Sequence, residues 1–342
     1  MATPKRLFGV FTAWVGLKML DIVPCIPPCI RTQAFRAPPT MANFVLMLLC
    51  LALGVVLRVS GRLPDNAHQT LNGVIVNVAL PALTLASIHR MSYDASLLYA
   101  VAMPWLVFAA GTVFFFGVAR LLRLDRATTG GLVLTGALGN TSFVGLPMIE
   151  TFYGRQALHV GLLIDQLGSY LVLSTLGIVL AAVCAGTSLS TRNVARRLVT
   201  FPPLIALGVA FLLVPVPFPG WLETVLGRLA DTIAPLALLS VGSQLRLDSF
   251  ARNRHTLSLG LTFKLVLAPL ILAPFYLGLP AGLHDTARIT LFEAAMAPMI
   301  GGGIVAMQHG LNPPLVSLMI GVGIPLSMIT VPLWWYLMQR FG

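Results

Sequence analysis

Long apolar runs separated by short polar loops dominate the chain from about residue 41 onward. Ten of these runs are long enough to cross a hydrocarbon core of about 30 Å as helices, some of them with tilt. The predicted spans cover residues 42–60, 69–89, 96–121, 128–152, 156–184, 199–217, 223–245, 255–279, 286–308 and 313–338. The pattern therefore predicts an all-α polytopic membrane protein with ten transmembrane helices.

The apolar pattern also repeats, with an offset of 154 residues. "NVALPALTLAS" at Asn77–Ser87 matches "DTIAPLALLSV" at Asp231–Val241. Five spans separate the two copies, and because five is an odd number the second copy is expected to be inverted in the membrane. We expect two inverted five-helix repeats, residues 42–190 and 191–342. Residues 1–41 form an N-terminal extension that is disordered, an over-extended translation start or a real extra element.

The fourth span contains residues that interrupt a helix. In "GALGNTSFVGLPM", Gly139 loosens the backbone, and Asn140 and Thr141 can cap a new helical start. Pro147 lacks an amide donor and disfavours the turn before it. In lipid, an interrupted backbone is tolerated only where it is buried in protein or lines a wet cavity. The stretch is thus a candidate transport site.

The ninth span carries an equivalent interruption. In "AAMAPMIGGGIVAM" a proline is followed by three glycines, and the repeat register sets Gly139 and Asn140 opposite Ala297 and Pro298. Pro298 suits the first turn of a second half-helix. We expect helices four and nine to be broken and to cross at their breaks, as in secondary transporters. The alternative is a packing kink in each helix.

A broken helix presents free amides with partial positive charge, which favour an anion. The residues expected to bind the substrate are Gly139, Asn140, Thr141, Asp165, Gln166, Pro298, Met299 and Gly301.

Three ionisable residues lie inside spans: Asp165, Lys264 and Glu293. A charge there is costly, so each should face a cavity or a partner, or be neutral. They are the candidates for ion or proton coupling. The alternatives are a structural hydrogen-bonding role for Asp165, and an internal ion pair of Lys264 with Glu293 or Asp165.

The composition agrees with a membrane protein, since 57% of the residues are hydrophobic and 10% are charged. The net charge of +11 comes from basic residues in short loops rather than from one basic face, which argues against a nucleic-acid partner. The cysteines and histidines have no metal-binding spacing, and no P-loop, nucleophile elbow or dinucleotide fingerprint occurs. We expect no metal, no cofactor and no enzyme.

The loop arginines predict the orientation. Eleven lie in loops after odd-numbered spans and five on the opposite side. By the positive-inside rule the odd loops are cytoplasmic, and both ends of the ten-helix unit lie outside.

Five motifs carry a family resemblance: "NVALPALTLAS", "GALGNTSFVGLP", "LLIDQLGSYLVLST", "LADTIAPLALLSVG" and "EAAMAPMIGGGIVA". In this order, over about residues 42 to 338, they resemble the auxin efflux carrier family, which includes plant PIN-type carriers and bacterial organic-anion transporters. The resemblance implies that helices one, two, six and seven form a scaffold. The other helices would form a transport domain that moves in an elevator-like way.

The motifs at the two breaks depart from those of the plant carriers. The plant Leu-Pro-Asn-Thr is Leu-Gly-Asn-Thr at residues 138–141, and the plant Leu-Pro-Gln-Gly is Met-Ala-Pro-Met at residues 296–299. A long cytoplasmic loop between helices five and six is also absent from the sequence. These differences favour the bacterial branch, with a carboxylate such as a dicarboxylic acid as substrate.

The expected function is secondary transport of a small organic anion across the inner (plasma) membrane. A proton gradient, a sodium gradient and uniport all remain open. The alternatives are a sodium-coupled symporter of the bile-acid symporter kind, a membrane-embedded enzyme and a sensor. The expected partners are the anion, the lipid bilayer and, as one candidate assembly, a second copy of the chain bound through the scaffold helices.

Overall fold

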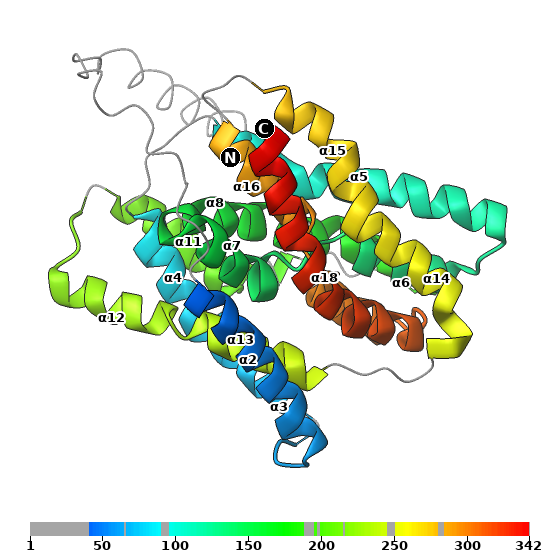
Figure 1. Ribbon diagram of the computed structural model, residues 1–342, viewed down its shortest axis with the longest axis horizontal. Helices are drawn as coiled ribbons and strands as arrows, with labels where there is room; N and C mark the ends of the chain where they lie inside the picture. Colours follow the sequence, from blue (N-terminus) through cyan, green and yellow to red (C-terminus); the bar gives the residue numbers. More distant parts are fainter. Residues whose placement is uncertain are drawn as a thin grey trace, which may run out of the picture. The chain divides into compact units, whose positions relative to one another are not determined.

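The computed structural model of the chain describes residues 41–64, 66–89, 96–187, 195–196, 199–214, 216–244, 250–279 and 284–341 (Figure 1). Internal contacts divide the chain into Met1–Arg36 and Ala37–Gly342, and the description below concerns the second unit. Apart from residue 41, the predicted extension 1–41 lies outside the described residues. So do four of the loop arginines that predict the orientation: Arg90, Arg192, Arg197 and Arg246.

The described part of the first predicted repeat is helical. Its α-helices are α2 (Met41–Val59), α3 (Ala67–Val74), α4 (Leu80–Ile88), α5 (Ser96–Leu122), α6 (Arg126–Gly136), α7 (Leu146–Tyr153), α8 (Leu158–Leu163) and α9 (Ile178–Ala185). Wider π-helical turns interrupt them at η1 (Ile75–Ala79), η2 (Thr141–Gly145), η4 (Ile164–Tyr170) and η5 (Leu173–Gly177), and η3 (Arg155–Ala157) is a short 3₁₀ turn.

The described part of the second predicted repeat is helical as well. Its elements are α11 (Pro202–Leu213), α12 (Gly220–Ala230), α13 (Ile233–Gln244), α14 (Phe250–Thr262), the π-helical turn η6 (Phe263–Leu267), α15 (Ala268–Leu277), α16 (His284–Ala294), α17 (Ile300–Gln308) and α18 (Pro313–Phe341).

Six helical segments in the described residues are long and apolar enough to cross a membrane. They are Ala67–Ile88, Ser96–Leu122, Arg155–Ala185, Gly220–Gln244, Asn253–Leu277 and Pro313–Arg340. Two shorter apolar helices, Asn43–Val59 and Pro202–Leu213, correspond to the predicted first and sixth spans. The predicted fourth and ninth spans are each divided into two helices, as the sequence indicates. The chain is therefore a multi-pass membrane protein.

Three of the π-helical turns have the same cause. Each ends two residues before a proline: η1 before Pro81, η2 before Pro147 and η6 before Pro269. A proline has no N–H to donate and its ring presses on the carbonyl of the preceding turn, so that turn widens. As a result, the helices carry distorted turns at places that the prolines specify.

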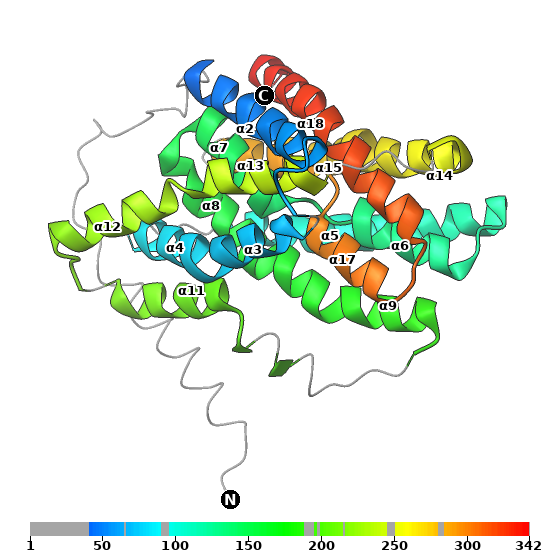
Figure 2. The ribbon, with the colours of Figure 1, turned by 90° about the horizontal axis from the view of Figure 1, so that it is seen from below.

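Helix α13 packs along α2, and both views show the two helices side by side (Figures 1 and 2). A Cβ atom on Gly54 would collide with the carbonyl oxygen of Leu239, and one on Gly242 would collide with that of Leu51. Small residues at a helix contact let two membrane helices approach closely. Helix α4 packs against α11 and α12 in the same region.

Apolar side chains cover the exposed faces of several helices. Leu98 and Val113 of α5 are 73% and 76% exposed, and Leu212 of α11 is 78% exposed. The segments around the two breaks are buried instead of exposed. At the second break, for example, every residue from 289 to 300 is buried. Lipid would cover the apolar faces, and the protein itself encloses the breaks.

Candidate functional site

The two broken helices meet at their breaks. Helix α6 ends at Gly136 and α16 ends at Ala294, and the chain between each end and the next helix is non-helical. Gly139 and Pro298 face each other in an isolated antiparallel bridge. The predicted contact between the breaks is thereby confirmed. The pairing is antiparallel, so Gly139 lies against Pro298 rather than against Ala297, with which the repeat aligns it.

Backbone hydrogen bonds close this crossing. The Asn140 amide donates to the Ala297 carbonyl at 2.8 Å, and the Met299 amide donates to the Leu138 carbonyl at 3.2 Å. Each break therefore satisfies polar backbone groups of the other, which in lipid would be costly to leave unpaired. The prediction that Pro298 lies in the first turn of a half-helix is wrong: α17 begins at Ile300, because Pro298 is held extended against Gly139.

A glycine allows the second half-helix to approach the first. A Cβ atom on Gly302 of α17 would overlap the carbonyl oxygen of Leu134 in α6. The first residue of the predicted glycine run, Gly301, is partly exposed, whereas Gly302 and Gly303 are buried. Close backbone packing thus holds α17 to α6 beside the crossing.

Asn140 caps the helical segment that follows the first break. Its Oδ1 atom accepts a hydrogen bond from the Phe143 amide at 3.1 Å, as predicted. The side chain is 2% exposed, and its Nδ2 group has no hydrogen-bond partner among the described residues. A buried amide donor at the crossing is therefore available to a ligand.

Thr141 does not cap the helix, contrary to the prediction. Its hydroxyl donates to Oδ1 of Asp165 at 2.6 Å, and the adjacent Ser142 side chain is a second donor to the same carboxyl group. Asp165, on η4, is 4% exposed. The structure thus brings Asp165 to the first break, and Ser142 is a residue that sequence reasoning missed, although it continues the run of polar residues after Asn140.

Gln166 points elsewhere. Its Nε2 group donates to the Thr84 hydroxyl on α4 at 2.6 Å, and Thr84 in turn donates to the Leu80 carbonyl at 2.8 Å. These bonds tie η4 to α4 rather than to either break. Of the adjacent pair predicted to bind substrate, only Asp165 hydrogen-bonds to the crossing region.

Lys264, on η6, lies at the end of α16. Its ammonium donates to the carbonyl of Ala294, the last residue of that helix, at 2.9 Å, and the side chain is 1% exposed. The position that a Cβ on Gly139 would occupy lies 3.1 Å from Nζ. A buried positive charge therefore stands directly beside the crossing.

Glu293 is buried completely and its carboxylate oxygens have no hydrogen-bond partner among the described residues. A Cβ on Gly145 would lie 2.5 and 2.6 Å from the two oxygens, so the carboxyl group packs against the backbone of η2. Asp165 and Lys264 are the charged groups that act on it electrostatically. The alternative of a direct ion pair of Lys264 with Glu293 or Asp165 is not found among the described residues, where the Lys264 ammonium donates to the Ala294 carbonyl.

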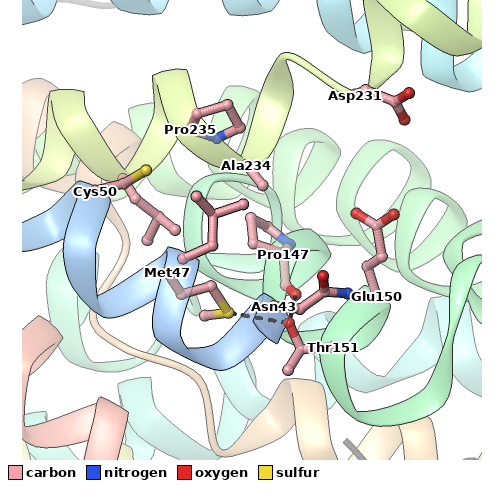
Figure 3. A pocket seen from close by; sticks show the side chains of 11 residues that line it. Asn43, Met47, Cys50, Pro147, Glu150, Thr151, Asp231, Ala234 and Pro235 are labelled. Carbon is pink, nitrogen blue, oxygen red and sulfur yellow. Dashed lines mark hydrogen bonds between the residues drawn. The ribbon is translucent and has the colours of Figure 1, made fainter. Parts of the chain in front are cut away.

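A cavity of about 220 Å³ lies between α2, α7 and α13 (Figure 3). Pro147 of α7, Met47 of α2 and Pro235 of α13 line it, and the Glu150 and Asp231 carboxylates lie at one side. The Thr151 hydroxyl donates to the Met47 sulfur at 3.1 Å within it. Sequence reasoning missed this cavity, because nothing in the sequence around Met47 or Pro235 indicates that α2, α7 and α13 enclose a space.

An exposed ion pair lies next to the cavity. Arg155 contacts Asp231 at 2.5 Å and Glu150 at 3.6 Å. It joins the end of α7 to the turn between α12 and α13, with Arg155 and Asp231 side chains 55% and 53% exposed. Such a pair contributes about 0–1 kcal/mol to stability.

The chain matches the model of the membrane transport protein family over residues 39–335. It is 30% identical over 294 residues to an uncharacterized transporter of Methanothermobacter thermautotrophicus, covering 84% of this chain and 95% of that protein. It is 22% identical over 316 residues to the uncharacterized transporter MJ1031 of Methanocaldococcus jannaschii, covering 87% and 99%. The uncharacterized transporter YfdV of Escherichia coli K12 is 21% identical over 296 residues, covering 80% and 89%.

These matches span almost the whole described helical unit, including both breaks, and they agree with the resemblance of the sequence motifs. The chain therefore belongs to the membrane transport protein family, that is, to transporters of the auxin efflux carrier type.

Proposed function

We propose that the protein is a secondary transporter that moves a small organic anion, a carboxylate, across the inner (plasma) membrane by alternating access at the crossing. The observation that carries this proposal is the pair of breaks that bond to each other, while the buried Asn140 Nδ2 group has no partner in the part of the chain that the structure describes. The Lys264 ammonium beside them supplies a positive charge. Membership of a transporter family supports the proposal that the protein is a transporter.

The proposed architecture has ten transmembrane helices in two inverted repeats, residues 42–190 and 191–342. The antiparallel bridge between Gly139 and Pro298 supports it, because the repeat found in the sequence aligns Gly139 and Asn140 with Ala297 and Pro298, and the two breaks meet at these residues. Elements α2, α3, α4, α11, α12 and α13 belong to the predicted scaffold helices, and they pack extensively on one another. The remaining helices would form the moving transport domain.

The donors at the crossing favour a carboxylate. The first turns of η2 and α17 begin at the breaks, and amides in a first turn lack intrahelical partners. Together with the Asn140 amide group, they can donate to carboxylate oxygens, and such charge-assisted bonds are stronger than neutral ones. The Asp165 carboxyl group accepts from the Thr141 hydroxyl at 2.6 Å, which links Asp165 to the first break.

The charges around the crossing favour proton coupling. With all three groups ionised, Asp165, Glu293 and Lys264 would leave a net charge of −1 next to an anion. Glu293 is fully buried and no described residue donates a hydrogen bond to its carboxyl group, so its neutral form costs less than its ionised form. We propose that Glu293 carries the coupled proton.

Two alternatives predict different results. A sodium-coupled symporter of the bile-acid symporter kind would require sodium for uptake, and its cation would need the Glu293 carboxylate as a ligand. A membrane-embedded enzyme or a sensor would show no carboxylate flux. The observation that favours the sodium alternative is the position of the Glu293 carboxylate, which packs against Gly145 of η2 next to the first break.

Uptake by purified protein in proteoliposomes tests the proposal. A panel of labelled mono- and dicarboxylates is offered with and without a sodium gradient and with and without a pH gradient. We expect uptake of at least one carboxylate, stimulated by an inward proton gradient. The absence of flux for every carboxylate would refute the function, and uptake that requires sodium would favour the alternative.

Cysteine labelling in intact cells tests the orientation. A single cysteine at position 196 should be protected from an impermeant thiol reagent, and one at position 340 should react with it. Arg340 lies near the end of α18 and is exposed, and Arg196 is exposed as well, so both positions are accessible to reagent on their own side. The reverse labelling pattern would overturn the proposed orientation.

A further inference from the structure

The Glu293 carboxyl group lies in the space that a side chain on Gly145 would fill. A Cβ atom on Gly145 would lie 2.5 and 2.6 Å from its two oxygens, and a Cβ atom on Gly161 of α8 would lie 3.6 Å from one of them. No described residue donates a hydrogen bond to either oxygen. The carboxyl group is therefore held against the backbone of η2 at a place where two glycines make room for it.

A polar atom at this place can reach a backbone carbonyl of the same turn. In a helix, a serine or threonine hydroxyl bonds to the carbonyl three or four residues earlier. The Glu293 oxygens lie close to where the first atoms of such a side chain at position 145 would lie. The residues three and four positions earlier are Ser142 and Thr141, both in η2. Their carbonyls are the acceptors that the carboxyl group can meet.

Pro147 leaves one of these carbonyls without a helical donor. In the π-helical pattern an amide donates five residues back, as the Gly145 amide does to the Asn140 carbonyl at 3.0 Å. The acceptor that this pattern assigns to residue 147 is the Ser142 carbonyl, and a proline has no N–H to give it. Away from water, an acceptor without a donor is costly. The carbonyl that lacks a donor is thus one that the Glu293 carboxyl group can reach.

We infer that Glu293 is a neutral carboxylic acid whose O–H donates to the Ser142 carbonyl, in place of the amide that Pro147 lacks. An ionised carboxylate has only acceptors to offer this carbonyl, whereas the acid has one donor. Asp165 of η4 and Lys264 of η6 are the charged groups that act on Glu293, and their effects oppose each other. The inference deepens the proposed function and rests on it only in its consequence: release of the coupled proton would break a bond within the first break.

Infrared spectroscopy of the purified protein in lipid tests this bond. A carboxylic acid has a C=O stretching band that a carboxylate lacks, and we expect the difference between wild type and Glu293→Gln to contain it at neutral pH. Pro147→Ala supplies an amide that competes for the Ser142 carbonyl, so the band should shift to higher frequency there. Each variant is compared with its own Glu293→Gln double variant. Pro81→Ala is the control, because Pro81 follows the π-helical turn η1 in the same way, and it should leave the band unchanged.

Thermal unfolding gives a second readout in the presence of the native proline. Glu293→Gln keeps a donor in its side-chain amide, so its Tm should stay close to that of the wild type at neutral pH. Glu293→Met keeps the length of the side chain and removes the donor, so its Tm should fall by roughly 2 °C or more. In the Pro147→Ala background the same change to methionine should cost less, because the new amide at position 147 serves the carbonyl.

Three results would overturn the inference: no Glu293 band at neutral pH, a band that Pro147→Ala leaves unchanged, or an equal Tm for Glu293→Gln and Glu293→Met. The two Glu293 variants decide the question even if Pro147→Ala does not fold. None of these measurements needs a substrate. A failure here is thus distinct from a failure of the proposed function, which would appear as absence of carboxylate flux.

Discussion

The two breaks of the crossing are equivalent in position and different in chemistry. At the first break, polar side chains serve the start of a helix: Asn140 caps it, and Thr141 binds Asp165. At the second break, Met299 precedes the first turn of α17 and provides no side-chain cap. The polar side chain at this break is Lys264, whose ammonium donates to the last carbonyl of α16. The first break thus presents the Asn140 amide donor to the crossing, and at the second break the Lys264 ammonium is bound to the Ala294 carbonyl.

This difference shows how a pseudo-symmetric backbone can hold an asymmetric site. The hydrogen bonds between the breaks use backbone atoms on both sides, so they are alike in the two halves. The side chains are free to differ because the backbone is already satisfied. A single substrate can then meet an amide group from one half and a positive charge from the other.

The largest expected effect is on transport, at the first break. Asn140→Ala should lower the affinity for the carboxylate by roughly 10- to 100-fold, since a hydrogen bond to a charged group is worth about 1.5–3 kcal/mol. Loss of the cap should also cost about 0.5–2 kcal/mol of stability. Uptake in proteoliposomes and thermal unfolding measure the two effects separately.

Two variants control this prediction. Asn140→Asp keeps an acceptor for the Phe143 amide and removes the amide donor, so stability should be retained more than affinity. Asn77→Ala removes an exposed asparagine that only donates to the Gly73 carbonyl, and it should transport normally. Equal kinetics for Asn140→Ala and the wild type would move the substrate site away from the first break.

The next effect tests the packing of the two halves. Gly302→Ala places a methyl group on the Leu134 carbonyl oxygen, so α6 and α17 must separate. Overpacking of this kind typically costs about 1–3 kcal/mol, and here we expect the upper end, measured as a lower unfolding midpoint. The control is Gly117→Ala, where nothing lies within 4 Å and the helix should become slightly more stable. Equal midpoints for the two variants would contradict the close approach.

Thr141→Val tests the hydroxyl contact at the first break. It removes the bond to Asp165 with little change of shape, and we expect a loss of about 1.5 kcal/mol, since Ser142 remains as a donor. Thr175→Val is the control, because that hydroxyl donates only to the Leu171 carbonyl one turn back. The difference in unfolding midpoint between the two variants measures the contribution of the hydrogen bond to the Asp165 carboxylate. Equal midpoints would show that this hydrogen bond does not stabilise the first break.

The smallest effect lies at the far end of the first half-helix, where Asp125 caps α6. Its carboxylate accepts from the Thr128 amide at 2.7 Å and from the Thr128 hydroxyl at 2.8 Å. Partial burial raises the pKa of Asp125, but these hydrogen bonds outweigh it and the pKa lies below the usual 3.8. Asp125→Ala should cost about 1 kcal/mol at neutral pH.

The pH dependence follows from the direction of this shift. Because the pKa is lower in the folded state, the cap contributes fully above the pKa of the unfolded chain and is lost as the pH falls through the folded pKa. The stability difference between wild type and Asp125→Ala should therefore shrink on acidification. Asp125→Asn keeps a cap without titrating, and its difference from Asp125→Ala should persist. Parallel pH profiles for all three proteins would contradict this role.

The sequence predicts the two breaks and their contact because backbone breakers encode them directly. Gly139, Pro147 and Pro298 mark the interruptions, and the repeat shows that the two interrupted segments correspond. It does not predict which way a polar side chain turns. Gln166 follows Asp165 in sequence but bonds to Thr84, because a helix directs neighbouring residues about 100° apart.

The same limit applies to Lys264 and to the cavity. Pairing of opposite charges is the natural expectation for Lys264, yet the Ala294 carbonyl lies closer to it than either carboxylate does. The cavity depends on how α2, α7 and α13 pack, which no local pattern records. Pro298 was expected in the first turn of a half-helix, but α17 begins only at Ile300, since the bridge to Gly139 keeps Pro298 extended.

The bridge between the breaks has an evolutionary consequence. Its bonds join the main-chain atoms of residues 138, 140, 297 and 299, so they use no polar side-chain group. Mutation can change the ligand-facing side chains without dismantling the framework that holds them. Lineages can then diverge in cargo while they inherit one backbone crossing, and two copies of a duplicated gene can specialise around it independently.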